Sequence, residues 1–230
     1  MSCKAETIMS CKPDISIVCI WPDYPVEIGG GTRTGGSSAS DHDTGYPPGG
    51  SGGSTDGDGD LYLRLGHAGI LLIKGGTGPA SAHYFEFGRY SGLNPTHFGN
   101  VQEYAVTSIV LNDDGWPTIA SLQATSRVIT RGSGRNTFMH GNVSHKCGGE
   151  AFDKAKTFAE GFRSEYNLVT NSCMMFAHKV NKARGWNWFG PIPVWNSNPR
   201  AEMERGLLNN YITYNPEGDR FRESVWQISE

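Results

Sequence analysis

Residues 61–90 read LYLRLGHAGILLIKGGTGPASAHYFEFGRY and carry the clearest strand pattern of the sequence. Leucines alternate with other residues over 61–65 and an apolar run fills 70–73, so these parts indicate a strand pair or one bent strand. The turn signal KGGTGP follows them. Residues 83–90 then read as another strand, which is rich in aromatic side chains.

Strand and helix patterns continue on both sides of this stretch. The segment 131–149 is rich in glycine and is expected to be irregular. Strands that come first and helices that follow predict an α+β fold, in which an antiparallel sheet packs on helices. The expected strands are 15–20 and 101–111, and the expected helices are 117–129, 151–166, 173–182 and a short one around 202–210.

The length of 230 residues, at 25.0 kDa, fits one large domain or two small ones. We expect a single domain over 1–230, with its recognisable core at 61–182. Residues 29–60 are Gly-rich and carry almost no large apolar side chain, so they are expected to form a flexible loop or linker. The acidic run DGDGD at 56–60 resembles the start of a calcium loop but lacks the glycine and glutamate that follow in such loops, which favours a solvated turn.

Composition and charge argue against several classes of protein. A net charge of −3 and a pI near 6.2 argue against nucleic-acid binding. No apolar run approaches the roughly 20 residues that cross a bilayer, so stable membrane insertion is not expected. No apolar stretch follows the first lysines before Pro13, so no export signal is expected. Five cysteines at wide spacing make a poor disulfide framework, and we expect reduced thiols at synthesis.

Cys173 is the best candidate for a nucleophile. It begins the predicted helix 173–182, directly after the polar residues Thr170, Asn171 and Ser172. The dipole and the free N–H groups of a helix N-terminus lower the pKa of a thiol and stabilise an oxyanion. The alternative is a structural cysteine on the buried face of the helix.

A thiolate nucleophile needs a base, and His67 is the favoured candidate. Glycines on both sides of it leave room for a cysteine or a substrate to approach; the alternative is a satisfied core histidine. His178 follows Cys173 on the same helix but lies well around its circumference, which makes it a poor partner. Glu86 is the carboxylate of an otherwise apolar strand and is the candidate to orient the imidazole, unless it faces solvent.

A metal site is the competing interpretation. His140, His145 and Cys147 could supply three ligands from a Gly-rich loop, but their spacing matches no strong zinc signature. A fourth ligand would have to come from another part of the chain. We therefore expect no metal.

Three motifs together resemble one family of enzymes. GHAGILLI at 66–73 and YFEFGRY at 84–90 resemble the histidine and acid strands of circularly permuted papain-fold enzymes, which are relatives of NlpC-type cell-wall peptidases. NSCMMFA at 171–177 resembles their cysteine-bearing helix start. The likeness extends over about 61–180, with the histidine strand before the cysteine helix. It is greatest to antibacterial effectors that are delivered by type VI secretion.

The resemblance implies a cysteine peptidase or amidase that hydrolyses amide bonds in the stem peptides of bacterial peptidoglycan. Cys173 is then the nucleophile, His67 the base and Glu86 the orienting acid, and neither a cofactor nor a metal is required. The substrate-binding residues that the resemblance implies are Asn171, Ser172 and Tyr90.

The same resemblance implies partners and a location. A protein of this kind would be made in the bacterial cytoplasm without a signal peptide and delivered to the periplasm of a target cell. Its partners would be a spike component of the secretion machine and a cognate immunity protein. The alternatives are a papain-like acyltransferase, deamidase or peptidase acting on a protein or lipid, and a catalytically silent binding module. Trp21 and the tryptophans of the tail either line a groove or belong to the core.

Overall fold

The computed structural model describes residues 11–24, 26–28, 54–55, 61–63, 66–88, 98–132, 135–147, 150–166, 171–185 and 210–224. The helices in these ranges are α1 (Ile119–Gly132), α2 (Ala151–Gly161) and α3 (Cys173–Ala183). The strands are β1 (Asp14–Trp21), β2 (Val26–Ile28), β3 (Ser54–Thr55), β4 (Leu61–Leu63), β5 (His67–Ile73), β6 (Gly78–Ala80), β7 (Ala82–Gly88), β8 (Phe98–Tyr104), β9 (Ile109–Leu111), β10 (Met139–Lys146), β11 (Ser164–Glu165), β12 (Tyr211–Asn215) and β13 (Arg220–Glu223).

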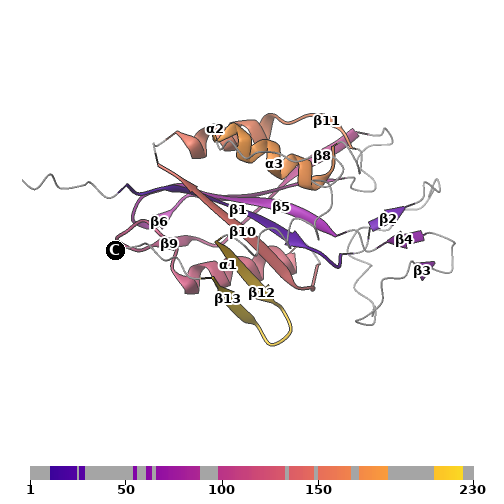
Figure 1. Cartoon of the computed structure of the whole chain (residues 1–230), viewed down its shortest axis with the longest axis horizontal. Helices are drawn as coiled ribbons and strands as arrows, with labels where there is room; N and C mark the ends of the chain where they lie inside the picture. Colours follow the sequence, from indigo (N-terminus) through magenta and orange to yellow (C-terminus); the bar gives the residue numbers. More distant parts are fainter. Residues whose placement is uncertain are drawn as a thin grey trace, which may run out of the picture.

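An eight-stranded sheet in the order β11-β8-β7-β5-β1-β10-β12-β13 organises the structure. Every pairing between these strands is antiparallel. Helices α2 and α3 cover one face of the sheet, and α1 packs against the other (Figure 1). The predicted α+β fold, with an antiparallel sheet packed on helices, is confirmed.

Strand β1 lies in the middle of the sheet and is buried along its whole length. Ile17 and Cys19 point into the core on the α1 side, whereas Val18 and Ile20 point into the core beneath α2 and α3. A strand covered on both faces is apolar throughout, as this one nearly is. The hydrophobic core includes residues of β1 and β12 as well as those of β5 and β7.

Strand β10 corrects the expectation that residues 131–149 are irregular. It pairs with β1 on one side and with β12 on the other. Its polar composition hides it in the sequence, but the Ser144 hydroxyl hydrogen-bonds the Ser16 hydroxyl at 2.8 Å inside the protein. Its glycine, Gly141, leaves the space that the Ile17 side chain fills in the neighbouring strand.

The predicted helices correspond to α1, α2 and α3, with one correction. The helix expected over 151–166 ends at Gly161, because Phe162 is extended and Ser164 pairs with Gly99 of β8. The strand expected over 101–111 is two strands, and the second of them, β9, pairs with β6 instead of the main sheet. The short helix expected around 202–210 lies almost wholly outside the described residues.

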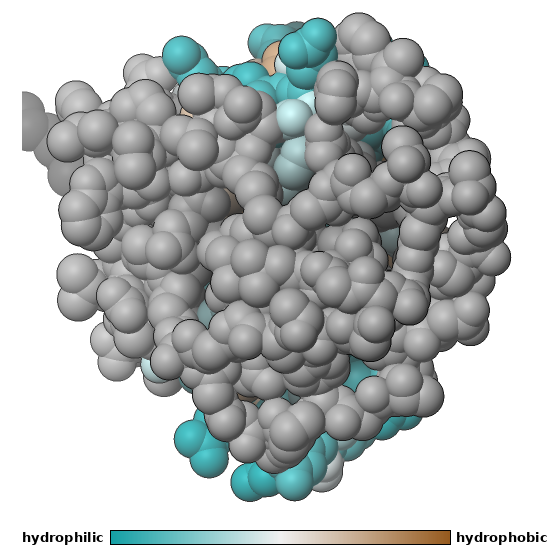
Figure 2. Space-filling model, turned by 90° about the vertical axis from the view of Figure 1, so that its right-hand side faces the viewer, coloured by the Kyte–Doolittle hydropathy of each residue, from teal (hydrophilic) through white to brown (hydrophobic). Residues whose placement is uncertain are grey.

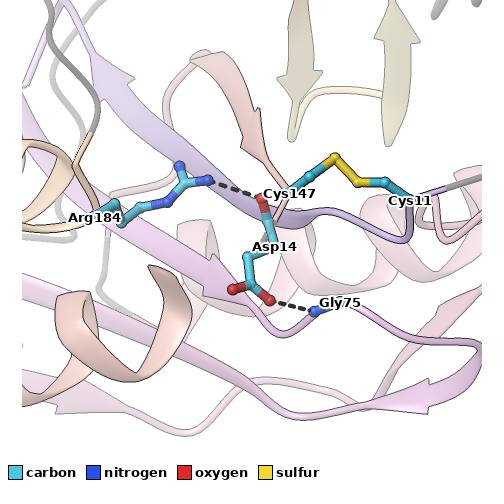
Figure 3. The surroundings of a disulfide bond; sticks show 5 residues. All are labelled: Cys11, Asp14, Gly75, Cys147 and Arg184. Carbon is cyan, nitrogen blue, oxygen red and sulfur yellow. Dashed lines mark hydrogen bonds between the residues drawn. A yellow bond between two sulfur atoms is a disulfide. The ribbon is translucent and has the colours of Figure 1, made fainter. Parts of the chain in front are cut away.

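A disulfide joins Cys11 to Cys147, with their Cα atoms 5.9 Å apart (Figure 3). It lies just beyond the last β1–β10 pair, in which Asp14 stands opposite Lys146. The Asp14 carboxylate accepts a hydrogen bond of 2.7 Å from the backbone N–H of Gly75. The wide cysteine spacing was expected to make a poor disulfide framework, but the fold brings together two cysteines that are 136 residues apart.

None of the helices within the described ranges combines the length and apolarity needed to cross a bilayer. On the face drawn in Figure 2, the described residues that reach the surface are largely hydrophilic.

Candidate active site

The candidate site lies at one end of the two central strands β1 and β5. Trp21, the last residue of β1, pairs with His67, the first residue of β5. Gly66 turns the chain into β5 with a φ of 79°, a left-handed conformation that favours glycine. Its N–H donates a 3.1 Å hydrogen bond to the carbonyl of Tyr24. This turn delivers the imidazole to the end of the sheet, where His67 is 7% exposed.

Glu86 approaches this imidazole from the neighbouring strand β7 and is fully buried, so the alternative that it faces solvent is wrong. Its Oε2 lies 3.4 Å from Nε2 of His67. The Tyr84 hydroxyl donates a 2.5 Å hydrogen bond to Oε1 of the same carboxylate. Gly69 lies opposite Glu86, and a Cβ at Gly69 would overlap the Tyr84 hydroxyl, so glycine is required for this contact.

Cys173 completes the arrangement from the other face of the sheet, as the first residue of α3. The Ser172 side chain caps this helix by accepting the N–H of Met175 at 3.4 Å. Cys173 is 4% exposed and hydrogen-bonds the imidazole of His67. Because Nε2 of His67 faces Glu86, Nδ1 is the nitrogen available to the thiol. The structure thus brings together all three residues that the sequence singled out.

Electrostatics favour an ion pair between the thiol and the imidazole. Burial by itself would raise the pKa of Cys173, but the charge and hydrogen bond of His67 and the backbone N–H groups of Ala68 and Met174 lower it. Burial and the charge of Arg135 oppose protonation of His67, yet the thiolate and the nearby carboxylate raise its pKa above the ordinary value. Opposite shifts in two adjacent groups are typical of an activated thiolate–imidazolium pair.

Arg135 is the member of the site that the sequence did not reveal. It is 4% exposed, and its two terminal nitrogens donate to the two carboxylate oxygens of Glu86, at 2.5 Å for Nη2 to Oε2. The guanidinium stacks over the rings of Trp21 and Tyr24, 4.9 and 5.1 Å from their centroids. Burial would raise the pKa of Glu86, but this cation and His67 lower it to about 2. A buried carboxylate requires a cation, yet nothing in the sequence says which of the arginines supplies it.

The three residues expected to bind substrate have different positions. Ser172 is the N-cap of α3, as described above. The side-chain amide of Asn171 donates to the Ser164 hydroxyl at 2.6 Å and accepts from Lys179 at 2.7 Å, so it fastens β11 to α3. Tyr90 lies outside the described residues. Substrate binding by these residues stays a prediction.

The residues considered as metal ligands do not form a cluster. Cys147 is bonded to Cys11, and His140 hydrogen-bonds Asn142 at 2.7 Å. His145 packs edge-on against Trp116 instead. Across the described ranges, no group of three or more His, Cys, Asp or Glu side chains is arranged to hold a metal ion. The acidic run 56–60 lies outside the described residues.

Known proteins provide two comparisons with this chain. The family described as type VI secretion system effector TseH-like matches residues 16–184. The crystal structure of the type VI secretion system effector TseH is similar, with a TM-score of 0.66 and 24% sequence identity over 93% of this chain and 99% of that chain. Among curated proteins, no sequence matches this one.

The family match confirms the predicted likeness to type VI secretion effectors. It begins at residue 16, so it includes most of β1, which the expected likeness over 61–180 left out. Because the match spans well over half of its residues, this chain belongs to the TseH-like family of type VI secretion system effectors.

Proposed function

We propose that this effector is a cysteine hydrolase that cleaves amide bonds in the peptidoglycan stem peptides of the target cell. The observation that carries the proposal is the chain of contacts from Cys173 through His67 to Glu86. A thiol at a helix N-terminus, a base beside it and a carboxylate behind the base form the arrangement that activates a nucleophile.

The reaction follows from these positions. His67 takes the proton of Cys173, and the thiolate attacks the carbonyl carbon of the scissile amide. His67 then gives this proton to the departing amine, which leaves a thioester on Cys173. Water, deprotonated by His67, attacks the thioester, releases a carboxylate product and restores the thiol. Glu86 holds the imidazole in place in both halves of the reaction.

The N-terminus of α3 has a second role in this proposal. Backbone N–H groups of Ala68 and Met174 bond the Cys173 sulfur in the resting protein. In the tetrahedral intermediate, the oxyanion and this sulfur are bonded to the same carbon, so the oxyanion lies close to the sulfur. Donors in the first turn of α3 are therefore placed to stabilise the oxyanion, and the helix dipole adds to their effect.

A pocket lined by β8 and the C-terminal end of α2 is our candidate for binding part of the stem peptide. It has a volume of about 350 Å³, and its lining includes Asn100, Phe162 and Arg163. Asn100 pairs with Gly88 at the end of β7, two residues beyond Glu86.

The place of action and the partners belong to the same proposal. Type VI secretion effectors are delivered into target cells. Because peptidoglycan surrounds the cell outside its inner membrane, we propose the periplasm of the target cell as the place of action. Loading onto a spike component and protection of the producer by a cognate immunity protein complete the proposal.

Expression in the bacterial periplasm tests this function. We would compare the wild type with Cys173→Ala and His67→Ala, and use His145→Ala as a matched control, since His145 is exposed and lies outside the site. Purified sacculi would be treated with each protein, and the released fragments identified by mass spectrometry. Thermal unfolding of each variant would establish that it is folded.

We expect the wild type and the His145→Ala control to lyse cells and to release fragments that share one new amide-derived terminus. Both site variants should be folded and inactive. Lysis by the wild type with intact sacculi would contradict the peptidoglycan substrate and indicate another acyl group. Undiminished toxicity of Cys173→Ala would contradict hydrolysis and indicate a binding module.

A further inference from the structure

The Arg135–Glu86 pair occupies an unusual place for a buried ion pair, directly behind the base of the site. Both carboxylate oxygens of Glu86 receive a guanidinium nitrogen, and Oε2 also lies 3.4 Å from His67 Nε2. The rings of Trp21 and Tyr24 hold the guanidinium in this position. We infer that Arg135 is a positioning residue, which neutralises Glu86 so that the imidazolium of His67 can pair with the thiolate.

The positive and negative charges of this buried cluster balance one another. With Arg135 in place, Glu86 is paired with the guanidinium and the imidazolium of His67 is paired with the thiolate of Cys173. Without Arg135, the Glu86 carboxylate would pair with the imidazolium of His67. A thiolate at Cys173 would then be a second negative charge beside a single positive charge. Charges that are out of balance are costly where water is excluded, so the thiol would keep its proton.

The other titratable groups that face the cluster do not supply a positive charge that could replace that of Arg135. Cys19 on β1 and Tyr84 on β7 both interact with Glu86 and Arg135. Burial, followed by the charge of Glu86, raises the pKa of both, so both are neutral near pH 7. Tyr24 contributes its ring to the guanidinium. Among these groups, the charge of Arg135 is thus the one that offsets Glu86.

The inference rests on the proposed function only in taking Cys173 as the nucleophile, and its test needs no peptidoglycan. Alkylation by iodoacetamide reports the thiolate, and peptide mass spectrometry locates the label on Cys173 and separates it from the other cysteines. The rate would be measured from about pH 4 to pH 9, a range that brackets the ordinary histidine and cysteine pKa values. The variants are Arg135→Met, Arg135→Lys and the double variant Glu86→Gln/Arg135→Met, with Cys173→Ser as the blank.

The wild type should still be alkylated at about pH 6, where an ordinary thiol is almost fully protonated. Arg135→Met should reduce this rate at least about tenfold, which corresponds to a rise of one unit or more in the thiol pKa. Arg135→Lys keeps the positive charge but loses the bidentate contact with Glu86. It should therefore raise the thiol pKa by less than Arg135→Met does. The double variant removes both charges and should return the profile toward that of the wild type.

A purely structural arginine would lower the melting temperature in its variants without moving the alkylation profile of the folded protein. Superimposable profiles for the wild type and the Arg135 variants would overturn the inference, as would a wild type that is unreactive at about pH 6. If Arg135→Met does not fold, the alkylation profiles of Arg135→Lys and of the double variant are compared with the wild-type profile instead. The alkylation profiles could be as expected although the wild type leaves sacculi intact. That result would overturn the proposed function and leave this inference standing.

Discussion

Removal of the Cys11–Cys147 disulfide should reveal how strongly the central strand β1 depends on its anchor. The bond closes the end of the β1–β10 ladder at which Asp14 begins β1. The Asp14 carboxylate accepts the backbone N–H of Gly75 at 2.7 Å and that of Phe152, in the first turn of α2, at 2.9 Å. One end of the strand is thus connected to the β5–β6 turn, to α2 and to β10.

The length of the closed loop sets the magnitude of the effect. A separation of 136 residues corresponds to about 5 kcal/mol of loop-closure entropy at 25 °C in the chain-entropy model. Loss of native disulfides from small domains typically costs about 2–5 kcal/mol. We therefore expect reduction to lower the free energy of unfolding by about 2–5 kcal/mol.

Urea unfolding followed by tryptophan fluorescence measures this difference. The samples are the oxidised wild type, the wild type in a phosphine reductant, and the double variant Cys11→Ser/Cys147→Ser. The intact mass should rise by two hydrogens on reduction of the wild type. The double variant with and without reductant is the control for effects on the other cysteines.

Coincident unfolding curves for the oxidised and reduced wild type would contradict a stabilising role of the disulfide. So would an oxidised sample whose mass contains no disulfide. A reductant effect of equal size in the double variant would mean that another thiol is responsible. Because the bacterial periplasm is an oxidising compartment, the bonded form is the one expected at the proposed place of action.

Other predictions concern the site and its surroundings. Glu86, with a pKa of about 2 against an ordinary 4.5, contributes up to about 3 kcal/mol of stability that is present above pH 4.5 and lost as the pH falls toward 2. Urea unfolding across this range should show a smaller loss in Glu86→Gln, and an equal loss would contradict it. Gly69→Ala should lower stability by about 1–3 kcal/mol and reduce activity, because its Cβ displaces the Tyr84 hydroxyl. The control Gly132→Ala, which meets no atom within 4 Å, should leave the melting temperature nearly unchanged. Asn100→Trp should fill the proposed peptide pocket and lower kcat/KM on sacculi. Alkylation of Cys173 should stay at the wild-type rate. An unchanged kcat/KM would remove the pocket from the proposal.

Local patterns in the sequence determined much of the site. Helical spacing after Ser172 predicted the helix that Cys173 begins, and the structure confirms it as α3. The glycines around His67 and the single carboxylate in an apolar strand indicated His67 and Glu86. These signals are readable because strand alternation, helix capping and the burial of a charge each depend on residues within a few positions.

Polar residues with distant partners were the main source of error. Residues 131–149 were expected to be irregular because they are rich in glycine, yet they contain β10. In this strand Ser144 is buried and hydrogen-bonds Ser16, 128 residues away. Arg135 lies 49 residues from Glu86, in a segment that shows no pattern of its own. In a sequence, a polar side chain is taken for a surface residue unless the partner of its hydrogen bond or ion pair is known.

By itself, the sequence determined the α+β class, the three helices and the order of histidine, glutamate and cysteine along the chain. The central place of β1, the pairing of Arg135 with Glu86 and the bond between Cys11 and Cys147 became visible in the folded protein. Propensity and periodicity act over neighbouring residues, so they can be read along the chain. Sheet order, buried ion pairs and disulfides join residues that meet only when the chain has folded.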